Sequence, residues 1–247
     1  MTGTGTDGVL QRFISEVLST VPTVAVWAHG SLALGDFRPG RSDLDLIALC
    51  ETPLDEEQRD RLAGMHRRLL DVEPAAAKLH CSYMARTALS EAGAHHVTWA
   101  HGTLQERPVT PVSRRELLDG GLTLYGPSPD SVLPPLAPGQ LEDFIRRDLE
   151  EFWLPATGKP LLWLQDIWVD LGLLVLARAT VTLRDGRLIT KREALAELLE
   201  LGAPADLVRD IHDRRYSHPR PIGRGRRIRR AYTARTFVRS GIEGMRP

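Results

Sequence analysis

The sequence lacks a long apolar run, and it has only two cysteines, Cys50 and Cys81, in 247 residues. No apolar stretch approaches the ~20 residues that a membrane-spanning helix needs, so we expect no membrane segment. Single cysteines in separate apolar runs indicate buried thiols rather than a disulfide framework or a CxxC metal site. The N-terminus also lacks the basic and apolar regions of a signal peptide, so we expect a cytoplasmic protein.

The sequence has no net charge either, because 32 basic and 32 acidic residues balance. Net charge alone therefore predicts neither nucleic-acid binding nor membrane binding. The chain is 42% hydrophobic and 26% charged. This composition is typical of a globular protein with one large domain or two small ones.

Hydrophobic periodicity in the first 90 residues alternates between helical and strand patterns. Apolar residues at helical spacing predict helices over residues 9–21 and 55–72. Short β-branched or alternating segments predict strands at residues 23–30, 42–51 and 77–85. The order helix, strand, strand, helix, strand indicates an α/β fold built on a sheet.

The character of the chain changes at a stretch rich in Pro and Gly, residues 126–139, which follows a short strand expected at residues 122–125. Such a composition indicates a domain boundary. Beyond it we expect a helix closed by Pro155, a long apolar helix ending near residue 186, and helices at 190–202 and from 204 onward. The sequence therefore predicts an α/β domain at residues 1–130 and a helical bundle at residues 140–247.

Two aspartates, Asp43 and Asp45, interrupt the apolar run "SDLDLIALCE". Residues two apart on a strand point to the same face, so the two carboxylates lie close together. Like charges this close repel each other unless a cation lies between them. Paired carboxylates completed by substrate phosphates are a common way to hold Mg²⁺, so both aspartates are candidate metal ligands.

A Gly-Ser pair, Gly30 and Ser31, lies upstream of these aspartates at the end of the preceding strand. Glycine lets the backbone approach a phosphate closely, and serine offers a hydroxyl and an N–H. Each motif alone is typical of an ordinary turn or strand end. Together, with Arg38 and Arg41 in the loop between them, they indicate a site for a nucleoside triphosphate and its metal.

The segment "HGSLALGDFRPGRSDLDLIAL" resembles the signature of the nucleotidyltransferase superfamily, which includes DNA polymerase beta, poly(A) polymerases and aminoglycoside nucleotidyltransferases. The resemblance implies a small mixed sheet with flanking helices, two Mg²⁺ ions, and transfer of a nucleoside monophosphate from an NTP to a hydroxyl group. By this resemblance, Asp43 and Asp45 are the catalytic metal ligands. It assigns the phosphate-side contacts to Gly30, Ser31 and Ser42.

The second half is similar to the helical domain of the streptomycin/spectinomycin adenylyltransferases. The similarity covers "LGLLVLARATVTLRDGRLITKREALAELL", and "LTLYGPSP" resembles the strand that leaves their first domain. It implies ATP as co-substrate, an aminoglycoside-like antibiotic as acceptor, and a role in antibiotic resistance. It also implies that Lys191 reaches the triphosphate and that Tyr216 lies near the nucleotide.

The chain departs from this family at the third carboxylate, which usually lies on a later strand. The matching segment, "AKLHCSYMA", has no acidic residue. His80 is the side chain there that best accepts a proton near neutral pH, so we expect it to be the general base. The alternatives are metal activation with two carboxylates alone, loss of transfer with nucleotide binding retained, or a carboxylate from the helical domain: Glu106, Glu142, Asp166 or Asp170.

The acceptor is the remaining question. Carboxylates in "LEDFIRRDLEEFW", with Asp166 and Asp170 near Trp163 and Trp168, suit a polycationic small molecule. The C-terminal segment suits RNA or a triphosphate instead, because it is rich in arginine with interleaved tyrosine. Its arginines are Arg214, Arg215, Arg220, Arg224, Arg226, Arg227, Arg229, Arg230, Arg235 and Arg239. We expect a small-molecule hydroxyl acceptor, with RNA or a protein side chain as the alternative.

Overall fold

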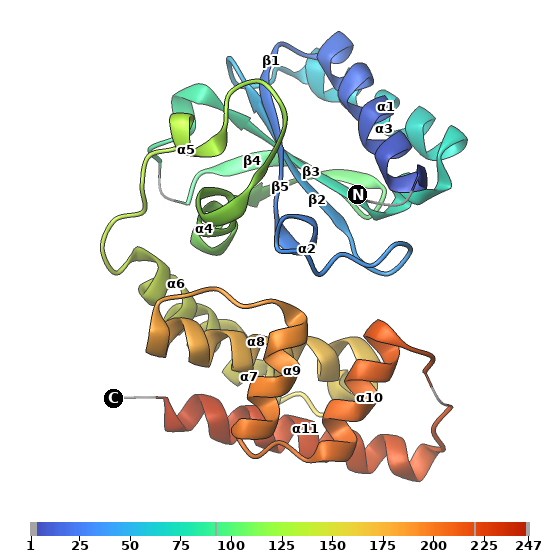
Figure 1. The fold of residues 1–247 in the computed structure, drawn as a ribbon, viewed down its shortest axis with the longest axis vertical. Helices are drawn as coiled ribbons and strands as arrows, with labels where there is room; N and C mark the ends of the chain where they lie inside the picture. The colour runs from blue at the N-terminus through green and yellow to red at the C-terminus, as the bar shows by residue number, and fades with distance from the viewer. Residues whose placement is uncertain (1–3, 92, 220, 246–247) are drawn as a thin grey trace. The chain divides into compact units, whose positions relative to one another are not determined.

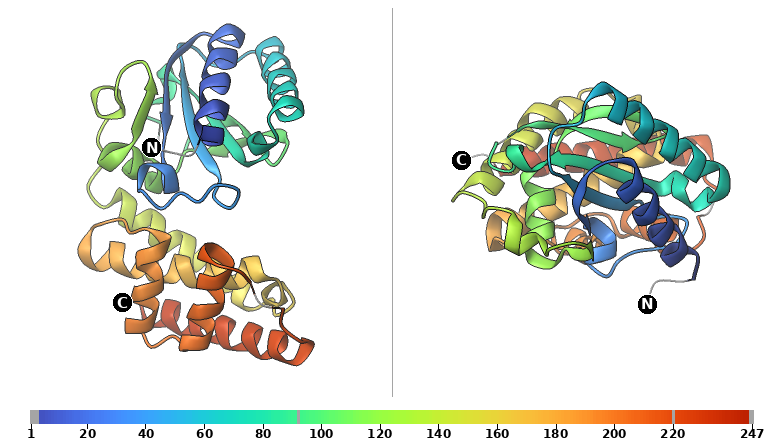
Figure 2. Two further views of the ribbon diagram at one scale, coloured as in Figure 1. Left: turned by 45° about the vertical axis from the view of Figure 1, so that its right-hand side comes forward. Right: turned by 90° about the horizontal axis from the view of Figure 1, so that it is seen from above.

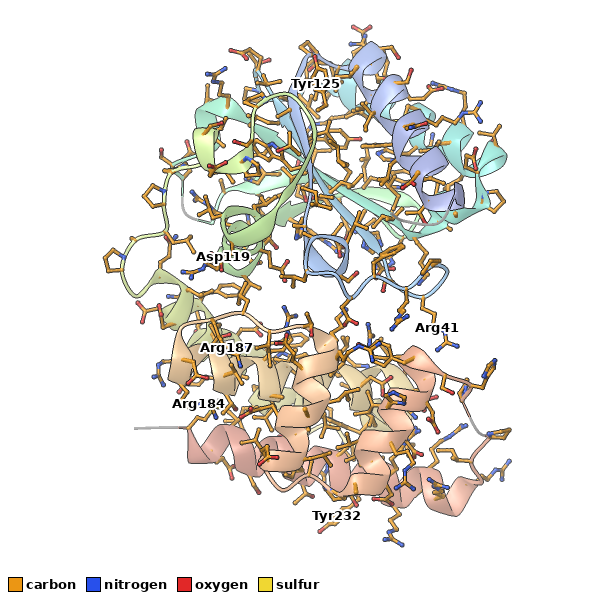
Figure 3. All side chains as sticks on the ribbon, viewed as in Figure 1. Arg41, Asp119, Tyr125, Arg184, Arg187 and Tyr232 are labelled. Carbon is orange, nitrogen blue, oxygen red and sulfur yellow. The ribbon has the colours of Figure 1, made fainter. Side chains whose placement is uncertain are left out.

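The computed structural model of the chain describes residues 4–91, 93–219 and 221–245, so Arg220 of the basic segment lies outside the described residues. The chain forms two compact units, residues 1–137 and 138–247, each drawn as a ribbon in Figure 1 and with its side chains in Figure 3. Among the described residues, no helix combines the length and the apolar character needed to cross a membrane.

The first unit is an α/β structure around one mixed sheet (Figure 1). In the described part of the chain, six strands follow the order β5-β4-β3-β2-β1-β6. The β2–β3 pair is parallel and the other neighbours are antiparallel. In chain order, the elements are α1 (Thr4–Thr20), β1 (Thr23–Ala28), α2 (Gly30–Ala33), β2 (Leu44–Cys50), α3 (Glu56–Val72), η1 (Pro74–Lys78), β3 (Leu79–Ala85), η2 (Arg86–Ala88), β4 (His95–Ala100), β5 (Thr103–Pro108), α4 (Pro111–Gly120), β6 (Leu122–Tyr125) and α5 (Pro129–Val132).

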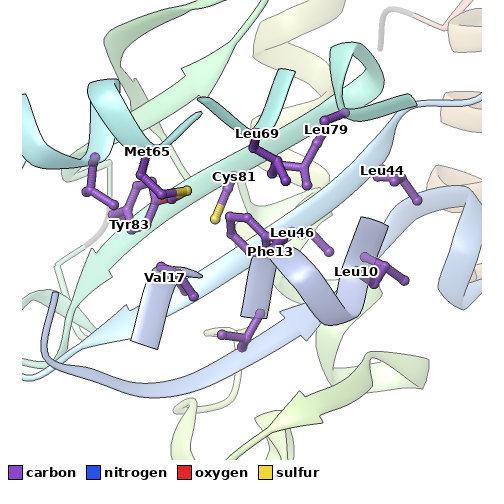
Figure 4. Close-up of a cluster of buried hydrophobic side chains, with 14 of the residues drawn as sticks. Leu10, Phe13, Val17, Leu44, Leu46, Met65, Leu69, Leu79, Cys81 and Tyr83 are labelled. Atoms are coloured by element: carbon purple, nitrogen blue, oxygen red, sulfur yellow. The ribbon is translucent and has the colours of Figure 1, made fainter. Parts of the chain in front are cut away.

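One face of the sheet is covered by α1 and α3, which lie side by side (Figures 1 and 2). Their apolar stripes bury side chains that each contribute roughly 1.5–3 kcal/mol when removed from water. Figure 4 shows this layer, whose members include Leu10, Phe13, Val17, Leu44, Leu46, Met65, Leu69, Leu79, Cys81 and Tyr83. The layer therefore takes the even-numbered residues of β2 and the odd-numbered residues of β3.

The opposite face of the sheet packs against α4. Trp27, Ile47 and Leu49 are buried there with Leu117 of α4. Successive strand residues point to opposite faces. Asp45 of β2 and His80 of β3 therefore belong to this second, α4-facing side of the sheet.

The sequence patterns located the first three strands, β6 and the helices α1 and α3, and they correctly predicted an α/β unit followed by helices. They did not reveal the β4–β5 hairpin or α4. β5 reads "TLQERP", and all six of its residues are exposed or half-buried, so it has no hydrophobic alternation to detect. Its place in the sheet follows from pairing with β4.

The second unit is helical. Its elements are α6 (Gln140–Asp148), the π-helical turn η3 (Leu149–Trp153), α7 (Leu154–Thr157), η4 (Leu162–Leu164), α8 (Asp166–Asp185), α9 (Lys191–Glu200), α10 (Ala205–Tyr216) and α11 (Arg224–Gly244). The expectation that Pro155 closes the first of these helices is wrong. The π-helical turn leads directly into α7, and Pro155 lies in the first turn of α7, where a proline is tolerated.

Candidate functional site

Gly30 and Ser31 are the first two residues of the one-turn helix α2, and this Gly-Ser turn lies directly against β2. The backbone N–H of His29 donates to the carbonyl of Asp45 at 2.9 Å. Gly30 has a φ of +61°, and a Cβ atom at this position would lie 2.7 Å from Asp45 Oδ2. Only glycine fits here, because any side chain would both strain the backbone and displace the carboxylate. The turn and the aspartate thus form one closely packed unit.

The two serines of the motif have different surroundings. Ser31 Oγ is buried and has no hydrogen-bond partner within the described residues. A buried hydroxyl without a partner is costly unless a ligand supplies one. Ser42 Oγ accepts a hydrogen bond from the N–H of Arg38 at 3.0 Å, and its own N–H donates to the Arg38 carbonyl at 2.8 Å. Ser42 therefore closes the loop before β2, and its predicted phosphate contact stays a prediction.

The paired aspartates lie at the start of β2. Asp43 immediately precedes the strand and Asp45 is its second residue. Their side chains are 42% and 34% exposed, so both carboxylates are open to a ligand. Lys78 Nζ lies 3.3 Å from Asp43 Oδ1 and places one positive charge beside the pair.

His80 lies next to Asp45 because β2 and β3 run in parallel with these two residues in register. Its Nδ1 is 3.8 Å from Asp45 Oδ1, and its side chain is 17% exposed. The structure thus brings together four of the predicted site residues: Gly30, Ser31, Asp45 and His80. Asp43 also lies in this region, because it precedes Asp45 by two residues at the start of β2.

A residue that the sequence patterns did not reveal also reaches this region. Glu116 of α4 lies with its Oε2 3.0 Å from His29 Nδ1, and the two side chains are only 8% and 14% exposed. His29 directly precedes Gly30, so α4 is tied to the Gly-Ser turn. The two residues are 87 positions apart, and no local pattern connects them.

The residues present fit a divalent cation bound together with a phosphate-bearing substrate. Two half-exposed carboxylates supply hard oxygen ligands, and the buried Ser31 hydroxyl lies in the turn that Asp45 contacts. No cluster of three or more His, Cys, Asp or Glu side chains suited to a metal is found among the described residues. Mg²⁺ sites often use one or two carboxylates and leave the other positions to water and substrate, so a two-carboxylate set is sufficient.

The predicted nucleotide contacts of the second unit lie at two adjacent helix ends. Lys191 is the first residue of α9, which begins with a capping box between Thr190 and Glu193. Tyr216 is the last residue of α10. The guanidinium of Arg192 lies 4.3 Å from the centre of the Tyr216 ring, so these two ends are in contact. The predicted roles of Lys191 and Tyr216 are proposals, taken up below.

Three of the four acidic residues proposed as a third ligand, Glu106, Asp166 and Asp170, have other partners. Asp170 of α8 accepts hydrogen bonds from Nε and Nη2 of Arg214, the shortest at 2.5 Å, and Asp166 pairs with the buried Arg230. Burial raises the pKa of Asp170, even though the hydrogen bond from Arg214 lowers it. Glu106 was expected in the helical domain, but it lies on β5 of the first unit and pairs with Arg59 at 2.7 Å.

These ion pairs also change the interpretation of the basic C-terminal segment. The half-buried Arg214 and the buried Arg230 pair with aspartates of α8, and Arg226 pairs with Asp210 at 2.9 Å. Arg235 donates to the Thr157 carbonyl at 3.1 Å. Much of the segment therefore stabilises the helical unit itself rather than presenting free charge.

Comparison with known proteins agrees with this geometry. Residues 10–90 match the model of the nucleotidyltransferase domain family. The fold is similar to the spectinomycin adenyltransferase AAD(9) from Enterococcus faecialis, solved with ATP and spectinomycin. The TM-score is 0.73 at 13% sequence identity, over 96% of this chain and 98% of the other. A search of curated protein sequences finds no significant match.

Proposed function

Since residues 10–90 form a nucleotidyltransferase domain and the chain is an enzyme of this type, we propose that it transfers AMP from ATP to a hydroxyl group of an aminoglycoside-like small molecule. The observation that carries the proposal is the packing of the Gly30–Ser31 turn against the Asp45 carboxylate. In this proposal the turn binds the phosphates and Asp45 binds a cation, and the two are in direct contact. The structure of AAD(9) with ATP and spectinomycin supports the choice of donor and acceptor class.

The reaction needs one bond formed and one broken. The acceptor oxygen attacks the α-phosphorus, the bond to the β-phosphate bridging oxygen breaks, and pyrophosphate leaves. In this proposal His80 takes the hydroxyl proton from its place beside Asp45. The backbone N–H groups of the turn and the Ser31 hydroxyl hold the phosphates. Catalysis comes mainly from positioning and from charge neutralisation.

Asp43 and Asp45 would hold the Mg²⁺, two ions by the family resemblance. When bound, Mg²⁺ supplies charge neutralisation at the phosphates and lowers the pKa of a coordinated hydroxyl. Gly30 keeps the space that the Asp45 carboxylate occupies. In the second unit, the family resemblance assigns Lys191 to the triphosphate and Tyr216 to the nucleotide, and these two residues lie at the adjacent ends of α9 and α10.

An acidic and aromatic surface on the second unit supports a cationic acceptor. The ring of Phe152 stacks on Trp168 with centroids 6.1 Å apart, and Phe152 is 51% exposed. Asp148 lies one helical turn before Phe152, and it accepts a hydrogen bond from the Trp153 side chain. Aromatic rings beside carboxylates are suited to amino sugars, which are flat on one face and positively charged.

The decisive experiment is a transfer assay. The protein, with Mg²⁺ and each NTP in turn, is incubated with a panel of aminoglycosides and with tRNA, and pyrophosphate release and the acceptor's mass are followed. We expect ATP and one or more aminoglycosides to react. Asp43→Asn and Asp45→Asn should each lower turnover by at least roughly a hundredfold, because each removes a charged ligand from the reacting phosphates.

The matched control is Asp71→Asn, since Asp71 is an exposed aspartate of α3 on the other side of the sheet. It should leave turnover unchanged. Near-normal turnover in Asp43→Asn, with normal unfolding, would refute the proposed site. ATP binding without pyrophosphate release on any acceptor would indicate a nucleotide-binding protein without transfer activity.

RNA is the second candidate acceptor, favoured by one surface feature. Arg224, Arg227 and Arg229 are exposed and make no ion pair among the described residues, and Tyr232 on the same helix is 63% exposed (Figure 3). Exposed arginine and tyrosine are typical of nucleic-acid contacts. RNA binding that weakens steeply with salt, and that is lost when these three arginines are neutralised, would support this candidate. Binding unaffected by their loss would exclude it.

A further inference from the structure

The β4–β5 hairpin has an unusual residue at its tip. Ala100 and Thr103 close the ladder, so His101 and Gly102 form a two-residue loop. Both have positive φ, +53° and +80°, which is the type I′ arrangement. Among the described residues, His101 is the one residue other than glycine with positive φ. Asn-Gly is the pair that this turn prefers, so turn geometry alone does not account for a histidine here.

The ring of His101 packs against a proposed catalytic residue. Its centroid lies 4.7 Å from that of the His80 ring, with an angle of 72° between the ring planes. This edge-to-face arrangement is the favourable geometry for an aromatic pair. The contact joins the hairpin tip to the α4-facing side of β3, where His80 stands beside Asp45.

His80 needs such support because its contact with Asp45 is loose. The Nδ1 to Oδ1 distance of 3.8 Å is longer than a hydrogen bond and does not set the ring's orientation. A preference of roughly 1 kcal/mol from ring packing favours one ring orientation about fivefold over another. His101 is the described aromatic side chain that contacts His80 through its ring.

We propose that His101 is a positioning residue, which holds the His80 ring in the orientation needed to receive the acceptor hydroxyl. This inference rests on the proposed function, because it assigns His101 a part in the same transfer reaction. It makes the hairpin tip part of the acceptor side of the site. The ring contact with His80 then gives a reason for a histidine at this positive-φ position, where asparagine is the usual residue.

The test compares His101→Asn with His101→Phe. Asparagine is favoured at this turn position, so His101→Asn keeps the hairpin while it removes the ring. Phenylalanine keeps a ring that can pack on His80, at a backbone cost that the unfolding midpoint reports. His95→Asn is the control, since His95 is an exposed histidine at the start of the same hairpin.

The first readout is independent of activity: the NMR signals of the His80 ring at one fixed pH. We expect His101→Asn to shift them and His101→Phe to shift them less. In the transfer assay, we expect His101→Asn to lower kcat/KM for the acceptor by about tenfold, with the KM for ATP unchanged. His101→Phe should recover part of this loss, and His95→Asn should change nothing.

Three results would overturn the inference. They are unchanged His80 signals in His101→Asn, shifted signals with unchanged acceptor kinetics, or equal losses for ATP and acceptor together with a lower unfolding midpoint. Failure of the proposed function looks different, because the unmodified protein would then transfer nothing to any acceptor. In that case the catalytic part of the inference falls as well, while the NMR signals still report whether the two rings are in contact.

Discussion

Glu116 and His29 form a hydrogen-bonded pair beneath the Gly-Ser turn, with 3.0 Å between Oε2 and Nδ1. Because an ionised carboxylate can only accept, His29 Nδ1–H is the donor. Both side chains are largely buried, at 8% and 14% exposure. Glu116 therefore connects the buried side of α4 to the residue that precedes Gly30.

We expect Glu116→Ala to lower the free energy of unfolding by about 1–3 kcal/mol, because it leaves a buried ring N–H without its acceptor. The KM for ATP should rise more than kcat falls, since the pair supports the turn that holds the phosphates. Chemical denaturation and steady-state kinetics check this. Glu106→Gln is the control: its ion pair with Arg59 is half-exposed and should contribute less than about 1 kcal/mol. Equal effects of the two variants would contradict the assignment.

Gly30→Ala tests the close packing of the turn against Asp45. The added Cβ would lie 2.7 Å from Asp45 Oδ2, whereas at Gly40, which also has a positive φ, it would meet nothing within 4 Å. Both variants should lose a similar free energy of unfolding, roughly 1–2 kcal/mol, from the strained φ. Only Gly30→Ala should lower turnover strongly, by at least about tenfold, because only it displaces the carboxylate. A comparable loss of turnover in Gly40→Ala would show that backbone strain, rather than the carboxylate, is responsible.

His66 makes the stability of the first unit depend on pH. It is 1% exposed, stacks on Trp99 at 4.5 Å, and shares a 2.7 Å hydrogen bond with the Tyr83 hydroxyl. Burial lowers the pKa of His66 to about 3. The unfolded chain therefore takes up a proton below about pH 6.5 that the folded chain excludes, so stability falls as the pH falls, by at most about 1.4 kcal/mol per pH unit.

Urea denaturation at about pH 7 and about pH 5 measures this slope. His66→Gln should flatten it, although the variant is less stable at both pH values. His95→Gln, at an exposed histidine of β4, should keep the slope of the unmodified protein. An unchanged slope in His66→Gln would mean that other groups carry the pH dependence.

Local patterns were sufficient for part of the candidate site. The Gly-Ser and Asp-Leu-Asp motifs lie fifteen or fewer residues apart along the chain and precede or follow adjacent strands, so their proximity follows from the pairing of β1 with β2. His80 was predicted because it is the side chain of "AKLHCSYMA" that best accepts a proton near neutral pH. Its place beside Asp45 depends on the parallel register between β2 and β3. The sequence pattern of one strand alone does not predict that register.

Distant residues could not be assigned in this way. Asp166 and Asp170 suited a cationic ligand by composition, but they pair with Arg230 and Arg214, which lie on other helices of the second unit. A carboxylate's partner depends on which helices pack together, and packing is decided by whole apolar faces rather than by the charged residues themselves. For the same reason, the sequence did not predict that Glu116 of α4 pairs with His29, because its partner depends on how α4 packs on the sheet.

The sequence by itself determined the helices and strands from α1 to β3, which surround the nucleotidyltransferase motif, because hydrophobic periodicity acts over a few neighbouring residues. Only the tertiary structure decided which side chains meet: His29 with Glu116, His80 with His101, and the arginines of α10 and α11 with α8. Each of these contacts joins segments that are far apart in the chain. They exist because the sheet register and the packing of buried apolar faces bring those segments together.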